Sequence, residues 1–308
     1  MGWGKKQTKV SEVSRLPAGF SNRSLFVLGL LLSAFGLLMI YSSSAVMGLQ
    51  KYGDSLYYVK KQAVFLGLGW FLYFVIAQMP IVRWVKMRMP ALMVALGLLI
   101  LVLLPGVGHT AGGAQRWIQL GIGQFQPAEL VRLFLVFYIA ATLTVRADRL
   151  DSFNKGFLPL LIVTAVAMFL LILQPDFGSA MSVFALSLAL WFVGRVPLAY
   201  IGGIFILALP AVVLLIFGAG YRAQRVMTFI NPWADPQGAG FQVIQSFLAF
   251  YNGGWTGVGL GNSQQKLYYL PEAHTDFIFS ILGEEMGLIG VFGVCALFII
   301  LLSVGATI

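Results

Sequence analysis

Charged side chains are scarce in this sequence: Asp, Glu, Lys and Arg make up only 10% of its 308 residues. Soluble globular domains carry about 25% charged residues. Hydrophobic residues make up 59% of the chain, and the mean hydropathy is +0.88. So few polar side chains cannot cover a water-exposed surface, which excludes a soluble enzyme domain. Disorder is excluded as well, because it requires low hydrophobicity and high charge.

Metal-binding and redox-active side chains are equally rare. The single cysteine, Cys295, lies in an apolar run, which excludes a disulfide framework and a cysteine-based metal site. Two histidines, His109 and His274, are too few for a dedicated histidine metal site. The sequence has neither an HExxH nor a Walker A motif, and GVGLG at 257–261 follows no strand that would make it a dinucleotide fingerprint.

Long apolar runs dominate what is present, among them LFVLGLLLSAFGLLMIYSS and FLPLLIVTAVAMFLLIL. A helix needs about 20 apolar residues to cross a bilayer, and continuous runs do not fit the alternating pattern of a β-barrel. We therefore predict an all-α fold, a polytopic membrane helix bundle. Its eight expected spans are at about 24–46, 62–80, 90–105, 127–145, 157–174, 178–194, 197–217 and 276–304.

The distribution of Lys and Arg predicts the orientation. Twelve basic residues fall in 1–23, 81–90, 146–156 and at Arg195, whereas seven are spread over the longer connections on the opposite side. Since cytoplasmic loops carry the excess of Lys and Arg, we expect a cytoplasmic basic tail at 1–23. The net charge of +9 is then a signal of topology, and no nucleic-acid partner is implied.

Residues 24–308 are expected to form a single transmembrane domain with one large extracytoplasmic loop, 218–275, before the last span. Loops of this length are usually functional or disordered, and the Trp, Tyr and Phe content of this loop does not indicate disorder. GFQVIQSFLAFY, at 240–251, has helical spacing. It predicts either a re-entrant or interface-lying helix or a helix that plugs the outer face of the bundle.

Charged residues in or near the spans are candidates for function, because charge is costly in a bilayer. Glu129 and Arg132 lie at i,i+3 and can pair, so they form either a structural ion pair or the lining of a polar cavity. Asp176 is placed to cap the helix that follows it. Of the adjacent Glu284 and Glu285, at least one must face the bundle, with Arg132 as a candidate partner.

The segment PEAHTDFIF, at 271–279, leads from the long loop into the last span. Thr275 or Asp276 is placed to cap that helix. At about 100° per residue, Asp276 shares a helix face with small residues. These are Ser280, Gly283, Gly287 and Gly290. The carboxylate therefore heads a groove that permits either close helix packing or room for a bulky lipid-linked ligand.

Three classes of protein fit polar residues at the outer ends of a bundle: an enzyme acting on a lipid-anchored substrate, a transporter or lipid flippase, and a membrane scaffold. A flippase needs a polar route through the whole bilayer, whereas these charges crowd the outer ends. Asp276 can act as a general base, and basic residues on the same side can hold phosphates. These are Arg116, Arg222, Arg225 and Lys266. The enzyme is therefore favoured.

Four motifs resemble those of the SEDS family (shape, elongation, division and sporulation). They are RWIQLGIGQFQPAEL at 116–130, LQPDFGSA at 173–180, YRAQRVMTFINPWADPQGAGFQVIQS at 221–246 and GVGLGNSQQKLYYLPEAHTDFIFSILGEE at 257–285. They occur in order over most of the chain. Ala273 within PEAHTDFIF is similar to the cell-division branch, since the elongation branch more often has Arg there.

The resemblance implies a peptidoglycan glycosyltransferase that polymerises lipid II into β-1,4-linked glycan strands during septal cell-wall synthesis. A lipid II flippase and a non-catalytic divisome scaffold are the alternatives. The implied location is the bacterial cytoplasmic membrane at the division septum, with an extracytoplasmic active side. The implied partners are lipid II, a class B penicillin-binding protein and other divisome membrane proteins. The cofactor is left open, with a divalent cation, Mg or Mn, at Asp276 as one expectation.

By resemblance, Asp276 is the catalytic base that deprotonates the 4-hydroxyl of the acceptor GlcNAc, which attacks the donor MurNAc with inversion. The expected substrate-binding residues are Glu129, Arg132, Arg116, Arg222, Arg225, Lys266, His274 and Asp176. Arg132 stands where the family usually has Lys, which keeps the charge but changes the geometry. The family usually has ten spans, so this chain is expected to lack the last two.

Overall fold

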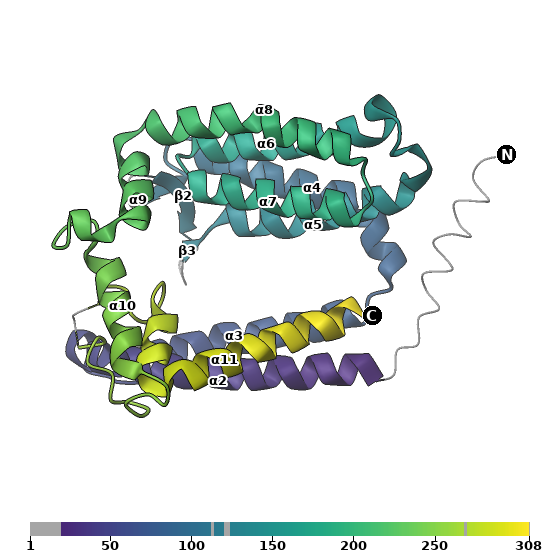
Figure 1. Cartoon of the computed structure of the whole chain (residues 1–308). Coiled ribbons are helices and arrows are strands. Elements are labelled where there is room, and N and C mark those ends of the chain that lie inside the picture. The colour runs from purple at the N-terminus through teal and green to yellow at the C-terminus, as the bar shows by residue number, and fades with distance from the viewer. Residues whose placement is uncertain (1–19, 112–113, 120–123, 268–269, 308) are drawn as a thin grey trace. The chain divides into compact units, whose positions relative to one another are not determined.

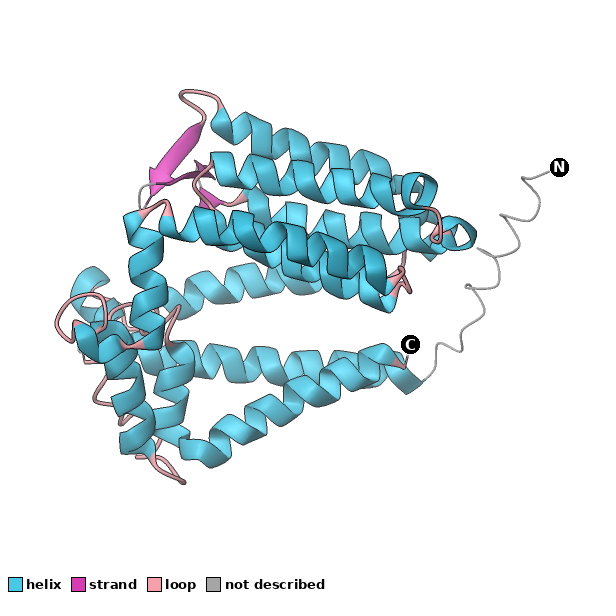
Figure 2. Ribbon diagram, turned by 45° about the horizontal axis from the view of Figure 1, so that its top comes forward, coloured by secondary structure: helices cyan, strands magenta, loops and turns pink. Residues whose placement is uncertain are grey.

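The computed structural model describes residues 20–111, 114–119, 124–267 and 270–307, and most of them are helical (Figures 1 and 2). The described chain divides into two compact units, one holding 79–213 and the other holding 20–78 together with 214–307. The division falls within one helix, α8, Leu198–Phe217. Each unit has a buried apolar core of its own.

The first unit is a helix bundle. Its main helices are α4, Ile81–Leu103; α5, Pro127–Val145; α6, Leu158–Leu173; and α7, Phe177–Val193 (Figure 1). Two short segments, η2, Ala147–Arg149, and η3, Phe153–Phe157, connect α5 to α6. The core buries Leu99, Ile139 and Trp191 completely, and the ring of Phe157 meets Trp191 edge-on at 4.9 Å between centroids.

A small antiparallel sheet follows α4 in the same unit, shown in magenta in Figure 2. Its strands are β1, Gly108–Ala111; β2, Ala114–Gln119; and β3, Gln124–Phe125, in the order β1-β2-β3. The sheet contacts α4 and α5. It occupies the connection between two predicted spans and was not predicted as a sheet. Its consequence for the site is that Arg116 lies on a strand.

The second unit combines two N-terminal helices with the C-terminal part of the chain. Its elements are α2, Phe20–Tyr52; α3, Tyr57–Ala77; α9, Gly220–Ile230; η4, Pro232–Ala234; α10, Phe241–Gly253; and α11, Ile278–Ala306. Helix α2 packs against α3 and α11, and α10 packs against α11. Helix α10 confirms the helix predicted at 240–251, whereas α9 was not predicted.

The predicted polytopic membrane bundle is confirmed as a mostly helical fold. Seven described helices are long and apolar enough to cross a membrane. The remaining expected span, 178–194, corresponds to α7, which has 17 residues. Helix α3 has no buried residue, and a helix that is apolar all round belongs in a core or a bilayer. Lipid is thus the solvent that suits these exposed apolar side chains.

The largest difference between a helix boundary and an expected span is at the start of α4. Helix α4 begins at Ile81, so Arg83, Lys86 and Arg88, expected in a connection, belong to its first turns. Helix α5 matches the expected span 127–145 at both ends. The cytoplasmic orientation of the N-terminus and the single domain 24–308 stay predictions. Residues 1–19 of the predicted tail lie outside the described residues.

Candidate active site

Asp276 lies in the last turn of the loop that precedes α11, with an exposed side chain. The helix begins at Ile278, and its N-cap is Phe277, which makes no side-chain cap. The expectation that Thr275 or Asp276 caps this helix is therefore wrong. Asp276 forms no hydrogen bond or ion pair with any residue that the structure describes. Its carboxylate is thus accessible and free to accept a proton or a hydrogen bond.

The residues just before Asp276 are fixed by two contacts. The half-buried ring of His274 lies against Tyr58, with 4.5 Å between ring centroids. Burial lowers the pKa of His274, and Lys51 acts in the same direction, whereas Glu272 opposes them. Thr275 donates from its hydroxyl to the Glu272 carboxylate at 3.1 Å. A neutral His274 ring therefore anchors the turn that carries Asp276.

The small residues expected to share a face with Asp276 have two roles in the structure. The hydroxyls of Ser280 and Ser246 lie 2.7 Å apart, and a Cβ added to Gly283 would overlap the ring of Phe250. Both contacts join α10 to α11, so close helix packing explains these two positions. The single face is interrupted further along, because Gly287 is non-helical, with φ 63° and ψ −169°.

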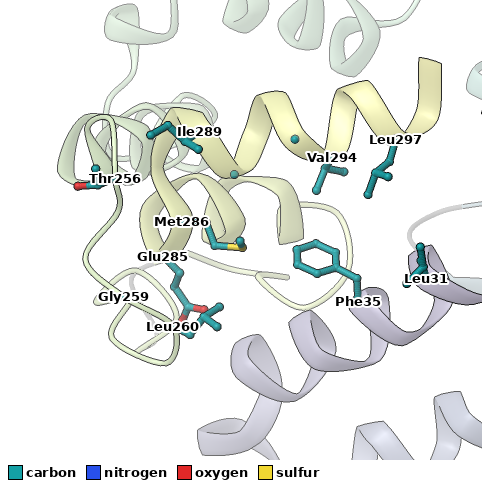
Figure 3. Close-up of a pocket in the computed structure, with 12 residues that line it drawn as sticks. Leu31, Phe35, Thr256, Gly259, Leu260, Glu285, Met286, Ile289, Val294 and Leu297 are labelled. Carbon is teal, nitrogen blue, oxygen red and sulfur yellow. The ribbon is translucent and has the colours of Figure 1, made fainter. Parts of the chain in front are cut away.

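An apolar pocket of about 760 Å³ lies between α2, α11 and the loop after α10 (Figure 3). Phe35 and Leu31 of α2 face Val294 and Leu297 of α11 across it. Among the described residues that line it, Glu285 alone is charged. A pocket of this shape can take an acyl or isoprenoid chain, because its lining is almost entirely apolar.

Glu284 and Glu285 are both buried, each 1% exposed. Glu285 pairs with Lys266, with 2.7 Å between Oε1 and Nζ. Glu284 accepts hydrogen bonds from the Ser263 hydroxyl and from the backbone N–H of Gln264. The expectation that Arg132 is a candidate partner is therefore wrong: Glu285 pairs with Lys266, ten residues before Asp276, and Glu284 is bound by the loop at 263–264.

Arg132 belongs instead to a polar cluster in the first unit. It pairs with Glu129 at 3.0 Å, as predicted, and also donates to the Ser179 hydroxyl at 3.1 Å. Asp176 caps α7, as predicted, by accepting from the Ser179 N–H at 3.2 Å. Arg116, on β2, lies 3.7 Å from the Asp176 carboxylate. The cluster thus joins β2, α5 and α7.

Two donors of this cluster are buried without a partner. The Nε atoms of Arg116 and Arg132 have no hydrogen-bond partner within the described part of the chain. Each arginine side chain as a whole is about one-third exposed, although its Nε is not. An accessible part of a guanidinium is suited to an anionic ligand, because its fork of donors matches phosphate and carboxylate oxygens.

The basic residues expected around a pyrophosphate occupy different surroundings. Arg222 and Arg225 lie on α9, where Arg222 donates to the Leu215 carbonyl at 2.9 Å and to the Tyr221 hydroxyl. Arg225 is exposed. Lys266, in contrast, is buried in its ion pair with Glu285. Arg222 and Arg225 therefore remain candidates for contact with phosphate, whereas the Lys266 ammonium is already bound.

Four polar residues that hold these clusters together were not predicted from the sequence. They are Ser42, Gln126, Ser179 and Ser263. The one signal for Ser42 is its place in the polar triplet SSS at 42–44 within an apolar span. Hydroxyl and amide side chains of this kind carry no charge pattern, so their partners emerge only from the fold.

The cell cycle protein family model, named for FtsW, RodA and SpoVE, matches residues 22–308. A probable peptidoglycan glycosyltransferase FtsW from Geobacter sp. (strain M18) is 41% identical over 279 residues, which cover 91% of this chain and 76% of that protein. A protein of the same name from Aeromonas salmonicida is 43% identical over 288 residues, covering 92% of this chain and 71% of that protein.

Two solved structures are also similar. One, from work on the structural coordination of polymerization and crosslinking by a peptidoglycan synthase complex, has a TM-score of 0.69 and 31% identity. It covers 91% of this chain and 75% of that chain. The rod shape determining protein RodA of Thermus thermophilus has a TM-score of 0.59 and 26% identity, over 91% of this chain and 72% of that chain.

Proposed function

The chain belongs to the cell cycle protein family of FtsW, RodA and SpoVE, and from this we propose that it is a peptidoglycan glycosyltransferase of the cell-division branch. Its substrate is lipid II, which it polymerises into β-1,4-linked glycan strands. The relatives named as FtsW support the division branch. The single structural observation that carries the proposal is the exposed carboxylate of Asp276 at the entrance to α11, which has no hydrogen-bond or ion-pair partner among the described residues.

Asp276 is the proposed general base. Its carboxylate takes the proton from the 4-hydroxyl of the acceptor sugar as that oxygen bonds to the anomeric carbon of the donor. The bond from that carbon to the pyrophosphate breaks on the opposite face, so undecaprenyl pyrophosphate leaves and the configuration inverts. A carboxylate that no described residue binds suits this step, because a base must be able to reach the substrate proton.

The partly accessible arginines are the proposed ligands of the anionic parts of lipid II. Arg222 and Arg225 on α9 are assigned to the pyrophosphate, and Arg116 and Arg132, whose side chains are about one-third exposed, are assigned to a further anionic group. Glu129, Asp176 and His274 hold the surrounding groups in place. No three His, Cys, Asp or Glu residues of the described ranges come together as a metal site. A Mg or Mn ion at Asp276 would therefore need substrate or water oxygens as its other ligands.

The proposed partner is a class B penicillin-binding protein, supported by the similar chain in a peptidoglycan synthase complex. A polymerase paired with a crosslinking enzyme must deliver its strand outside the cell. We therefore place the active side extracytoplasmic and the protein at the division septum, with other divisome membrane proteins around it.

The test is polymerisation of purified lipid II by the chain reconstituted with its transpeptidase partner. Asp276→Asn should lower the rate at least about 100-fold, the usual size of a general-base contribution. Asp54→Asn is the matched control, because Asp54 is a loop carboxylate already bound by Lys60 at 2.7 Å. Undiminished polymer from Asp276→Asn would overturn the base assignment. Translocation of lipid II across vesicles without polymer would favour the flippase.

A further inference from the structure

Helix α11 is broken at Gly287, and the loop after α10 fills the break. The backbone carbonyls of Glu284 and Glu285 accept hydrogen bonds from the N–H groups of Val258 and Gly259, both at 3.0 Å. Beyond the break, the N–H groups of Leu288 and Ile289 donate to the carbonyls of Gly254 and Trp255, at 2.9 and 3.1 Å. The backbone groups that the break exposes are therefore satisfied by residues 254–259, as buried backbone requires.

The side chain of Glu284 holds the next stretch of the same loop. Its carboxylate accepts from the Ser263 hydroxyl and from the N–H groups of Gln264 and Gln265, both at 3.2 Å. This carboxylate thus has donors from three consecutive loop residues. The Glu284 carboxylate therefore fixes the direction of the loop after residues 254–259.

Glu285 and Lys266 form a buried ion pair with a third member. The Ser42 hydroxyl, on α2, lies 2.7 and 2.6 Å from the two Glu285 oxygens and 3.2 Å from the Lys266 ammonium. The Lys266 and Glu285 side chains are only 7% and 0% exposed. One junction therefore joins α2, α11 and the loop.

From this junction the loop runs to Asp276 through an apolar cluster. Leu270 and Ala273 are buried and pack with Met39 of α2 and with Ile281 and Leu282 of α11. The loop is then held at His274 by Tyr58 of α3. The described part of the segment from Lys266 to Asp276 is therefore anchored at Lys266, at Leu270 and Ala273, and at His274.

We propose that Lys266 and Glu285 are positioning residues, and that their ion pair with Ser42 fixes the loop that presents Asp276 to the substrate. The proposal rests on the proposed glycosyltransferase function. Under this proposal Lys266 does not bind the pyrophosphate, because its buried ammonium already donates to Glu285 and Ser42. A lysine that bound substrate phosphate would have to leave a carboxylate buried without its partner, which is strongly unfavourable.

The test compares Lys266→Met, Glu285→Gln and the double variant for kcat and for the KM of lipid II. Each single variant leaves one buried polar group unpaired, so we expect kcat to fall at least about 10-fold with KM within about twofold. The double variant removes both charges and should recover kcat to within about threefold of wild type. Lys60→Met with Asp54→Asn, at an exposed ion pair, should leave both constants unchanged.

A phosphate-binding lysine gives the opposite pattern, and that pattern would overturn the proposal. Lys266→Met would then raise KM, Glu285→Gln would change little, and the double variant would be as poor as Lys266→Met. If the single charge variants fail to fold, Ser42→Ala replaces them in the test. It is a milder change that keeps the ion pair, and we expect it to cause an intermediate loss of kcat.

Amide hydrogen exchange of residues 254–267 separates this proposal from the proposed function. Exchange there should rise in Lys266→Met and Glu285→Gln and return toward wild type in the double variant, whether or not the protein polymerises lipid II. A wild-type protein without polymerase activity would overturn the function alone. Unchanged exchange in both single variants would overturn the positioning role.

Discussion

Arg132 donates a 3.1 Å hydrogen bond to the hydroxyl of Ser179, and through it the ion pair at the start of α5 is connected to the cap of α7. The same hydroxyl donates to Asp176 at 2.7 Å. One end of this network is buried, with the Asp176 side chain 5% exposed, and the other end is open, with the Glu129 side chain 57% exposed. A structural pair and a cavity lining, the two interpretations of Glu129 and Arg132, are therefore compatible.

At the buried end, replacing Asp176 should destabilise the protein more than replacing any exposed acid. Asp176→Ala removes an N-cap worth about 1 kcal/mol and leaves buried donors unsatisfied at about 1–3 kcal/mol each. The buried donors are the N–H and the hydroxyl of Ser179, whereas the part-buried Gln126 amide and the 34% exposed Arg116 side chain lose a partner that water can partly replace. Thermal unfolding in detergent checks this, with Asp176→Asn losing less because its amide oxygen can still cap. Equal unfolding temperatures for wild type and Asp176→Ala would contradict it.

At the open end, Glu129→Gln and Arg132→Gln should show measurable coupling. An exposed i,i+3 pair contributes about 0.3–0.5 kcal/mol, so Glu129→Gln is the milder change. Arg132→Gln also loses the hydrogen bond to Ser179, which adds about 0.5–1.5 kcal/mol. A double-mutant cycle measured by unfolding should give partial rescue in the combined variant. Strictly additive losses would show that the 3.0 Å contact contributes nothing to stability.

The helices were predictable because each is defined by local composition. Apolar runs placed the spans, and the i,i+3 spacing of Glu129 and Arg132 was enough to predict their ion pair. The cap of α7 by Asp176 was predictable for the same reason, since capping depends on residues within one turn.

The contacts between distant segments were not predictable. Lys266 and Glu285 are 19 residues apart and Ser42 lies 243 residues from Glu285, so their meeting depends on how the loop folds back into the break at Gly287. The expected cap at Thr275 or Asp276 came from starting the last span at 276, two residues before α11 begins, and the single face of small residues came from treating α11 as one regular helix. A glycine within a helical sequence pattern gives no indication that its φ is positive.

Acidification should loosen the turn that carries Asp276. Burial lowers the pKa of His274 below its ordinary 6.5, so below that pH the unfolded chain binds a proton that the folded chain does not. The contribution of His274 to the free energy of unfolding is therefore fully present above about pH 6.5 and decreases as the pH drops below that value. His274→Phe keeps a ring against Tyr58 but cannot titrate. Between pH 7 and pH 5, a range that spans the ordinary histidine pKa, its unfolding temperature should change less than that of wild type.

Gly287 should tolerate no side chain, because two independent constraints act on it. Its φ of 63° with ψ of −169° lies in a region that is essentially restricted to glycine and costs other residues about 1–3 kcal/mol. A Cβ there would also overlap the Trp255 carbonyl and the Gly257 N–H that fill the break. We expect Gly287→Ala to lower the unfolding temperature strongly and to raise amide exchange at 254–259.

The matched control for Gly287 is Gly293→Ala, six residues further along α11. Gly293 has helical geometry, and nothing lies within 4 Å of an added Cβ. Alanine is favoured over glycine in a helix interior by about 1 kcal/mol, so this variant should unfold at the wild-type temperature or above it. If both glycine variants unfolded alike, the break at Gly287 would not be what holds the loop against α11.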